Sequence, residues 1–146
     1  MDIRHTREAD YDKVSAVINE WWGGREMADM LPKLFFIHFS NTSFIAEKEG
    51  ELVAFLIGFI SQSKKGEAYV HFIGVHPSYR KKGLAFDLYN RFFEAVKKKG
   101  CSKVRCVTSP VNKNSIAFHK KFGFLVEPGN GKSDGVSVTK NYDGPG

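Results

Sequence analysis

The chain of 146 residues has the length of a single domain, and its composition, 42% hydrophobic with 13 Phe, is sufficient for a packed core. The formal net charge of +6 and a pI near 9.3 favour acidic partners, either a polyanionic cofactor or nucleic acid. The basic residues fall in short separate groups without interleaved aromatic residues, so a solvated surface explains most of them better than a nucleic-acid tract does.

No stretch of the sequence has the pattern of a membrane segment or a secretion signal. The longest apolar run, Leu52–Ile60, is far shorter than the roughly 20 residues that cross a bilayer, and the first residues are charged. Cys101 and Cys106 lie too close together in the chain for a disulfide between them to constrain the fold, and they lack the four-ligand pattern of a zinc site. We therefore expect a soluble, cytoplasmic protein without a metal.

The first third of the chain predicts one strand and two helices. Ile3–Thr6 has the pattern of a weak strand, and Asp10 can cap a helix that Gly23 and Gly24 end. A second helix is expected from Asp29, as its cap, through Phe39, with Pro32 in its first turn. The apolar face of the first helix has i, i+3, i+4 spacing and consists of Tyr11, Val14, Val17, Ile18, Trp21 and Trp22.

Three strands are predicted next, at Phe44–Glu47, Leu52–Ile60 and Ala68–Val75. The nearly unbroken apolar run of Leu52–Ile60 indicates a strand buried on both faces, and hence a central position in the sheet. Turn residues separate the three strands, Glu49-Gly50 in the first case and Lys64-Lys65-Gly66 in the second.

The remaining pattern predicts a helix, a strand and a second helix. Apolar residues recur at every fourth position from Leu84 to Val96, and Gly100 can cap this helix. Val104–Thr108 follows as a strand, and Asn112–Phe122 as a helix capped by Asn112. This order predicts a mixed α/β fold in which residues 68–108 form a right-handed crossover. Val136–Lys140 is the candidate for a last strand.

The stretch from Arg80 to Ala85, a basic turn between a strand and a helix, has the pattern of an anion site. The first turn of a helix carries N–H groups without intrahelical partners, and the helix dipole adds partial positive charge there. Gly83 lets a phosphate approach the backbone. The turn is therefore suited to a phosphate or pyrophosphate, although a solvated basic helix start is the simpler interpretation of the turn alone.

The flanking residues favour the phosphate site. Val75-His76-Pro77 precedes the turn, and Asn112-x-x-Ser115-Ile116-x-Phe118-His119-x-x-x-Gly123-Phe124 follows one helix and one strand later. Together these motifs resemble the GNAT superfamily of acyl-CoA-dependent N-acetyltransferases. That family carries V-x-P, then Q/R-x-x-G-x-G/A, then N-x-x-A-x-x-L-Y-x-x-x-G-F, at about this spacing. The resemblance spans roughly Ile3 to Phe124.

The resemblance implies a fold and a cosubstrate. The fold would be α/β (α+β): one domain over residues 1–146 with a mixed, mostly antiparallel sheet flanked by helices and splayed parallel strands at the cofactor site. The cosubstrate would be acetyl-CoA. By analogy with the family, the cofactor-binding residues would be Ile73, Gly74 and Val75 on the exposed strand edge, Arg80, Lys81, Lys82, Gly83, Leu84 and Ala85 at the pyrophosphate, and Asn112.

The resemblance also suggests catalytic and acceptor-binding residues. The amide of Ile73 would stabilise the oxyanion, and His119 occupies the place where the family has a tyrosine that protonates the departing thiolate. Some members place a glutamate base where Tyr69 stands here, so that base is absent in this chain. His71 is the candidate base in its place, directly or through a water. Trp22, Glu26 and Tyr69 would contact the acceptor. For each histidine and for Trp22, a purely structural role is the alternative.

The expected activity is the transfer of an acetyl group from acetyl-CoA to a primary amine by direct attack, on a small molecule or a peptide that the sequence does not identify. A non-catalytic acyl-CoA sensor is one alternative, because the family's tyrosine and glutamate are missing. A basic nucleic-acid-binding domain is another. No nucleic acid or membrane partner is expected, and a homodimer is a further hypothesis, because a poor last strand would leave a sheet edge uncovered.

Overall fold

The computed structural model describes residues 1–108, 113–128, 132–133, 136–137 and 142–143. Its main sheet follows the order β1-β2-β3-β4-β5, with antiparallel neighbours up to β4 and a parallel β4–β5 pair. This is the mixed, mostly antiparallel sheet that the family resemblance implies, with the apolar strand β3 at its centre, as its sequence predicts. The five strands are β1 (Asp2–His5), β2 (Phe44–Lys48), β3 (Glu51–Ile60), β4 (Glu67–Val75) and β5 (Lys103–Thr108).

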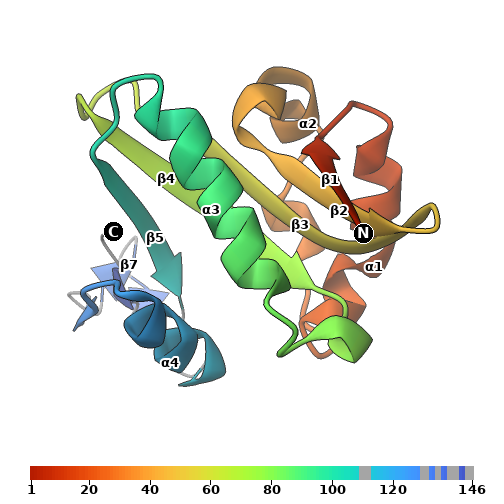
Figure 1. Ribbon diagram of the computed structural model, residues 1–146. Helices are drawn as coiled ribbons and strands as arrows, with labels where there is room; N and C mark the ends of the chain where they lie inside the picture. The colour runs from red at the N-terminus through yellow and green to blue at the C-terminus, as the bar shows by residue number, and fades with distance from the viewer. Residues whose placement is uncertain (109–112, 129–131, 134–135, 138–141, 144–146) are drawn as a thin grey trace.

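Helices cover both faces of the sheet (Figure 1). One face packs on α3 (Leu84–Lys97), through residues such as Leu56 and Val70. The other packs on α1 (Asp10–Trp21) and α2 (Leu34–His38), through Phe55, Ile57 and Phe72. Residues 54 to 57 of β3 alternate between the two cores, as the period of two along a strand requires. The remaining helical segments are η1 (Ala28–Met30), η2 (Ser40–Thr42), η3 (Pro77–Tyr79) and α4 (Lys113–Phe122).

Asp10 does not cap α1, contrary to the prediction, but anchors the helix to the sheet. It is the first helical residue, and the position before it makes no side-chain cap. Its two carboxylate oxygens accept 2.9 Å bonds from the Arg4 guanidinium, whose Nε donates to Glu47 at 2.8 Å. Burial raises the pKa of Asp10, but the bonds from Arg4 and from the Arg7 amide lower it more, so the net shift is downward.

The predicted helix from Asp29 to Phe39 is also wrong in its extent. The chain forms η1, then an extended residue, Leu31, and only then the short α2. Leu31 has φ −130° and ψ 72°, outside the helical region, because the ring of Pro32 disfavours helical geometry in the residue before it. The resulting bend brings the carbonyl of Met30 over β4, which matters for the candidate site.

The strand that extends the sheet beyond β5 is not the predicted Val136–Lys140. Val107 and Thr108 pair with β9 (Tyr142–Asp143), which also pairs with β6 (Glu127–Pro128). Val136 and Ser137 form β8, which pairs with β7 (Lys132–Ser133) in a separate small sheet, and residues 138–140 lie outside the described residues. The homodimer hypothesis, which rested on an uncovered edge, stays a prediction.

Candidate active site

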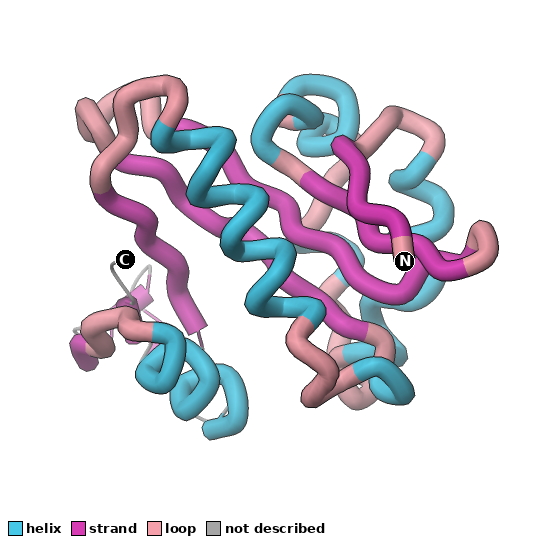
Figure 2. Tube along the Cα trace, in the orientation of Figure 1, coloured by secondary structure: helices cyan, strands magenta, loops and turns pink. Residues whose placement is uncertain are grey.

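The parallel strands β4 and β5 separate along their length. They pair only between Glu67–Val70 and Lys103–Cys106, whereas β4 continues to Val75. Within the described residues, nothing pairs with His71–Val75 on the side of β5, and Figure 2 shows the two strands diverging toward their C-terminal ends. The result is an open backbone edge in the middle of the molecule, which is the splay that the family resemblance implies.

The hydrogen bonding on the opposite side fixes which amides face this open edge. His76 N donates to Val53 O at 2.8 Å, and pairs along an antiparallel ladder alternate between bonded and non-bonded. The pairs Ala54–Val75 and Leu56–Ile73 are therefore non-bonded toward β3. The N–H and C=O groups of Ile73 and Val75 point away from β3, into the opening.

A β-bulge in β4 turns His71 toward α2. Ile57 lies opposite Phe72 and Gly58 opposite Val70, so His71 is the extra residue. Its ring stacks on Phe35 with 4.5 Å between ring centroids and meets Phe72 edge-on. The bulge therefore places the side chain of His71 on the α1–α2 face of the sheet, two residues before the amide of Ile73.

Gly74 is a packing glycine and not the bulge. A Cβ atom at this position would lie 2.8 Å from the Trp22 indole and 2.9 Å from the Phe55 ring. Trp22 therefore lies directly on β4 beside the open edge, half-buried against Phe55 and Phe72. Trp21 belongs to the core, with 5% of its surface exposed, while Glu26 is exposed in the loop that follows α1.

The turn from β4 into α3 presents backbone amides and positive charge together. Gly83 has φ +81°, and a Cβ atom there would meet nothing within 4 Å. The first bond within α3 runs from Asp87 N to Gly83 O, so the amides of residues 84 to 86 have no intrahelical acceptor. Lys81, also at positive φ, and Lys82 add charge to this helix end.

Arg80 ties this turn to its surroundings. Its Nε donates to Val75 O at 3.1 Å, and Nη2 donates to Trp21 O at 2.7 Å. The sequence suggests that Arg80 only adds charge for the pyrophosphate. The structure shows in addition that its guanidinium joins the end of β4 to the end of α1.

The two histidines predicted to be catalytic have opposite surroundings. His71 is half-buried, and its Nε2 lies 2.6 Å from Met30 O. Because a carbonyl oxygen only accepts, Nε2 carries the hydrogen and Nδ1 has a free lone pair. No bond to Nδ1 is seen among the described residues. His71 therefore has a nitrogen that can take up a proton.

His119, in contrast, lies in the core with 6% of its surface exposed. Its Nδ1 donates to Ser115 O at 2.7 Å, which leaves Nε2 to accept the Tyr89 hydroxyl at 2.6 Å. Burial lowers the pKa of His119, although the bond to Ser115 opposes the shift. Both ring nitrogens are thus engaged, and the aromatic rings that surround Tyr89 are those of Phe93, Phe118, Phe122 and Phe124.

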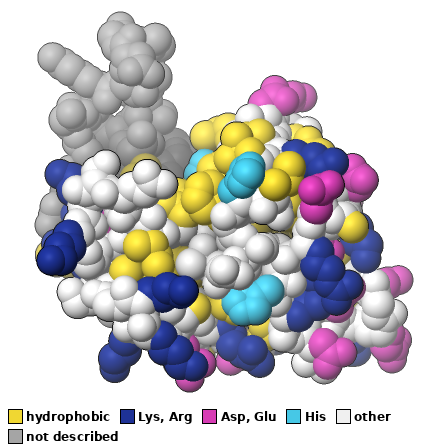
Figure 3. All heavy atoms as spheres, turned by 90° about the horizontal axis from the view of Figure 1, so that it is seen from above, with side chains coloured by type: hydrophobic (Ala, Val, Ile, Leu, Met, Phe, Trp, Pro, Cys, Tyr) yellow, Lys and Arg dark blue, Asp and Glu magenta, His cyan; other side chains and the backbone are white. Residues whose placement is uncertain are grey.

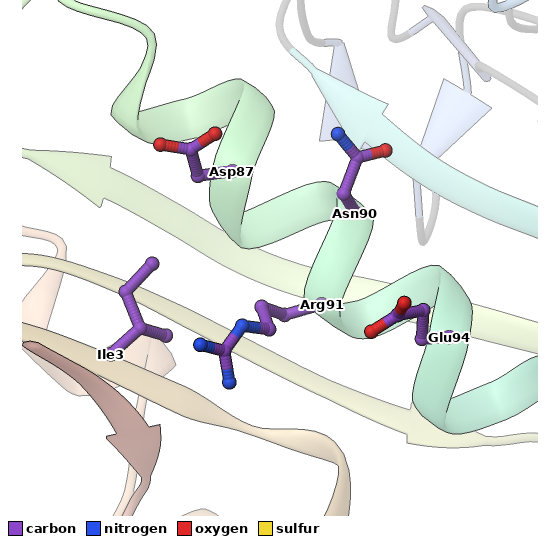
Figure 4. A pocket seen from close by; sticks show the side chains of 5 residues that line it. All are labelled: Ile3, Asp87, Asn90, Arg91 and Glu94. Atoms are coloured by element: carbon purple, nitrogen blue, oxygen red, sulfur yellow. The ribbon is translucent and has the colours of Figure 1, made fainter.

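A hollow of about 370 Å³ lies elsewhere, between α3 and β1 (Figure 4). Arg91 reaches from α3 toward Ile3, and Asp87 and Glu94 flank it with carboxylates. Mixed charge of this kind does not favour a polyanion. Among the described residues, no group of three or more His, Cys, Asp or Glu side chains could hold a metal ion, and no described helix is long and apolar enough to cross a membrane.

Comparison with known sequences decides the family. The sequence profile of the acetyltransferase (GNAT) family matches residues 5–124. The chain belongs to the GNAT acetyltransferase family. A curated relative, the acetyltransferase ECA0875 of Pectobacterium atrosepticum, is 30% identical over 132 residues, which cover 85% of this chain and 87% of that protein.

Solved structures share the GNAT fold at low identity. Arabidopsis thaliana Naa50, in complex with the bisubstrate analogue CoA-Ac-MVNAL, has a TM-score of 0.80 at 16% identity, covering 99% of this chain and 97% of that one. The diaminobutyrate acetyltransferase EctA of Paenibacillus lautus, in complex with diaminobutyric acid and coenzyme A, has a TM-score of 0.75 at 20% identity, covering 98% and 93%.

Within this GNAT domain, some residues that shape the site were not predicted. Met30 and Phe35 hold His71, and Tyr89 holds His119. Of these residues, only Tyr89 could have been predicted from the sequence, because a tyrosine on the apolar face of a helix needs a hydrogen-bond partner for its hydroxyl. Asn112, predicted to contact the cofactor, lies outside the described residues. Tyr69 is half-buried on the α2 face of β4, stacked on Phe59.

Proposed function

We propose that this protein transfers the acetyl group of acetyl-CoA to a primary amine by direct attack, without an acyl-enzyme. The observation that carries the proposal is the open edge of β4, which ends beside the amide-rich start of α3. An extended, polyanionic thioester needs both features: backbone groups along its pantetheine arm and an anion site at its pyrophosphate. The solved structures of EctA with coenzyme A and of Naa50 with a CoA conjugate support this choice of cosubstrate.

The residues present fit such a cosubstrate. The pyrophosphate would lie on the amides of residues 84 to 86, with the charges of Lys81 and Lys82 beside it, in the space that the missing Cβ of Gly83 leaves open. The pantetheine arm would pair with the N–H and C=O groups of Ile73 and with the N–H group of Val75, which face away from β3, whereas the Val75 carbonyl already accepts from Arg80. Acetyl-CoA then supplies an activated acyl group on a thiolate leaving group.

The amide of Ile73 and the ring of His71 would assist the transfer. The Ile73 N–H, fixed by the ladder to β3, would donate to the carbonyl oxygen as it gains negative charge. His71 Nδ1, which has its lone pair free while Nε2–H is held by Met30, would accept the proton that the amine loses, directly or through a water. The thiolate departs as the carbonyl re-forms.

Protonation of the thiolate by His119 also stays a prediction. In the neutral ring, Nε2 accepts from Tyr89, so transfer from this nitrogen requires that it first be protonated and that the ring leave Tyr89. The lowered pKa of His119 makes the protonated form less populated at neutral pH. His119 is therefore a weaker candidate for a catalytic group than His71.

His71→Gln tests the proposal, because glutamine can still donate to Met30 O but cannot act as a base. We expect acetyl-CoA affinity within about twofold of the wild type and kcat/KM for amines lowered by about a hundredfold. His5→Gln is a matched control, because the His5 ring also bonds a carbonyl, at 3.0 Å, and contacts a phenylalanine, Phe44, with 4.7 Å between ring centroids. Tight acetyl-CoA binding by the wild type without acetylation of any amine would instead favour the acyl-CoA sensor.

A further inference from the structure

A chain of half-buried aromatic rings leads away from His71 across the α1–α2 face of the sheet. Phe35 stacks on His71 and lies 5.4 Å from Phe39, measured between ring centroids. Phe39 lies 5.5 Å from Phe59, which in turn lies 5.5 Å from Tyr69. We name these five residues, which come from α2, its C-terminal cap Phe39, β3 and β4, the aromatic strip.

Exposed apolar side chains accompany the strip. Met30, Leu34 and Ile37, on η1 and α2, expose 54%, 46% and 45% of their surface. Figure 3, which looks onto the end of the molecule where α2 lies, shows hydrophobic side chains gathered in a group with a histidine among them. Exposed apolar surface that is contiguous, and not scattered singly, marks a binding site.

The strip is continuous with the proposed reaction centre. His71 is one of its members, and it is also the residue whose Nδ1 would take the proton from the amine. A molecule whose nitrogen lies at His71 and Ile73 therefore has aromatic surface directly beside it. The group next to its nitrogen would lose water on binding to this surface.

The absence of acidic side chains from the strip restricts the kind of acceptor that can bind to it. None of the five residues is a carboxylate, so the strip offers nothing to pair with the second or third ammonium of a polyamine. Apolar surroundings also favour the neutral form of an amine over its ammonium form, and only the neutral form has a lone pair for attack. A peptide would bring several amide groups, which cost free energy when they lose water without finding partners. The carbonyl of Met30 is already used by His71.

We propose that the acceptor is a small primary monoamine that carries an aromatic or branched aliphatic group within a few carbons of its nitrogen. This group packs on the aromatic strip while the nitrogen lies at His71. The inference rests on the proposed acetyl transfer and names the substrate class of that site.

Rates of CoA release with matched amines test this inference. The wild type is assayed with 2-phenylethylamine, 3-methylbutylamine, ethylamine, spermidine and a tripeptide with an N-terminal phenylalanine, and kcat/KM is expressed per concentration of neutral amine. We expect 2-phenylethylamine to exceed ethylamine by at least about tenfold, a discrimination within the range that hydrophobic pockets achieve. Equal values for these two amines, or values at least tenfold higher for spermidine or the tripeptide, would overturn the inference while leaving acetyl transfer intact.

Single substitutions test whether the preference for 2-phenylethylamine over ethylamine arises at the aromatic strip. Tyr69→Ser and Leu34→Ser should each reduce the ratio between 2-phenylethylamine and ethylamine by at least about threefold, and Leu34 is exposed, so its replacement does not disturb the core. Leu125→Ser is the control, since Leu125 is 63% exposed and follows α4, and its ratio should equal that of the wild type. A ratio unchanged in both Tyr69→Ser and Leu34→Ser would refute the role of the strip. Absence of CoA release with every amine would refute the proposed function itself.

Discussion

The two ends of α3 have nearly the same composition and opposite chemistry. Arg80-Lys81-Lys82-Gly83 precedes the helix, and Lys97-Lys98-Lys99-Gly100 closes it. Both glycines are left-handed, with φ of +81° and +90°, and at neither would a Cβ atom meet anything within 4 Å. A search for basic residues beside a glycine would therefore find two anion sites on this helix.

Backbone polarity separates the two ends. At the start of α3, the amides of residues 84 to 86 have no intrahelical acceptor. At its end, the amides of Lys98, Lys99, Gly100 and Cys101 fold back onto carbonyls of the last turns, as in a Schellman-type cap. The dipole also favours anions at the start and cations at the end. Lysines at the C-terminal end therefore stabilise the helix, whereas those at the N-terminal end are available to a ligand.

The sharpest test of this difference is the same substitution at both glycines. Gly83→Val and Gly100→Val impose the same left-handed strain, on the order of 1–2 kcal/mol, so the two variants should lose similar thermal stability. Only Gly83→Val adds bulk at the amides of the proposed pyrophosphate site. We expect it to weaken acetyl-CoA binding more than about a hundredfold in a calorimetric titration, with Gly100→Val close to the wild type.

If both variants bind acetyl-CoA equally well, the start of α3 is not the pyrophosphate site. If both lose binding and neither melts cooperatively, Gly83→Ala and Gly100→Ala repeat the comparison with a smaller side chain.

A smaller effect is expected from the lysines. Lys81→Gln with Lys82→Gln removes two charges near the proposed phosphates, each worth roughly 1 kcal/mol at contact distance in water, so acetyl-CoA affinity should fall about thirtyfold. Lys98→Gln with Lys99→Gln should change it less than twofold. Because about 1 M salt shortens the screening length to roughly 3 Å, the difference between the two double variants should largely vanish there. A difference that persists at high salt would mean that the lysines act through contacts other than charge.

The sequence was sufficient for the features that depend on local pattern. The apolar run of β3, the four-residue period of α3 and its closure by Gly100 all correspond to the observed elements. The N-terminal turn of α3 was predicted because an anion site of this kind is built from consecutive residues. The family motifs further implied the splay of β4 from β5, which local pattern alone would not have indicated.

The errors and omissions come from contacts between residues that are far apart in the chain. Asp10 had a cap's position in the sequence, but its partner is Arg4 in β1, which also bonds Glu47. His71 meets Met30 across 41 positions, and His119 meets Tyr89 across 30. Periodicity carries no information about such pairs, because tertiary packing alone brings them together. Pro32, in contrast, was a local signal that was misread, as a residue that starts a helix and not one that interrupts it.

The smallest expected effect concerns the middle of α3, where Tyr89 bonds His119, and it should appear in stability and not in binding. Burial lowers the pKa of His119 in the folded protein from its usual 6.5. Below about pH 6.5 the unfolded chain therefore binds a proton that the folded chain does not, and the free energy of unfolding decreases as the pH falls toward the lowered pKa. One such group contributes less than about 1.4 kcal/mol per pH unit. Asp10, whose pKa is lowered from 3.8, contributes only in more acidic solution.

Urea unfolding between pH 7.5 and 5, for the wild type and His119→Gln, isolates this contribution. Glutamine does not titrate, so the difference in unfolding free energy between the two proteins should shrink as the pH falls, and acetyl-CoA affinity at the start of α3 should be the same in both. A difference that stays constant across this range would show that the His119 ring takes up its proton in the folded state. Such a ring would release Tyr89 from Nε2 and would restore His119 as a candidate acid for the thiolate.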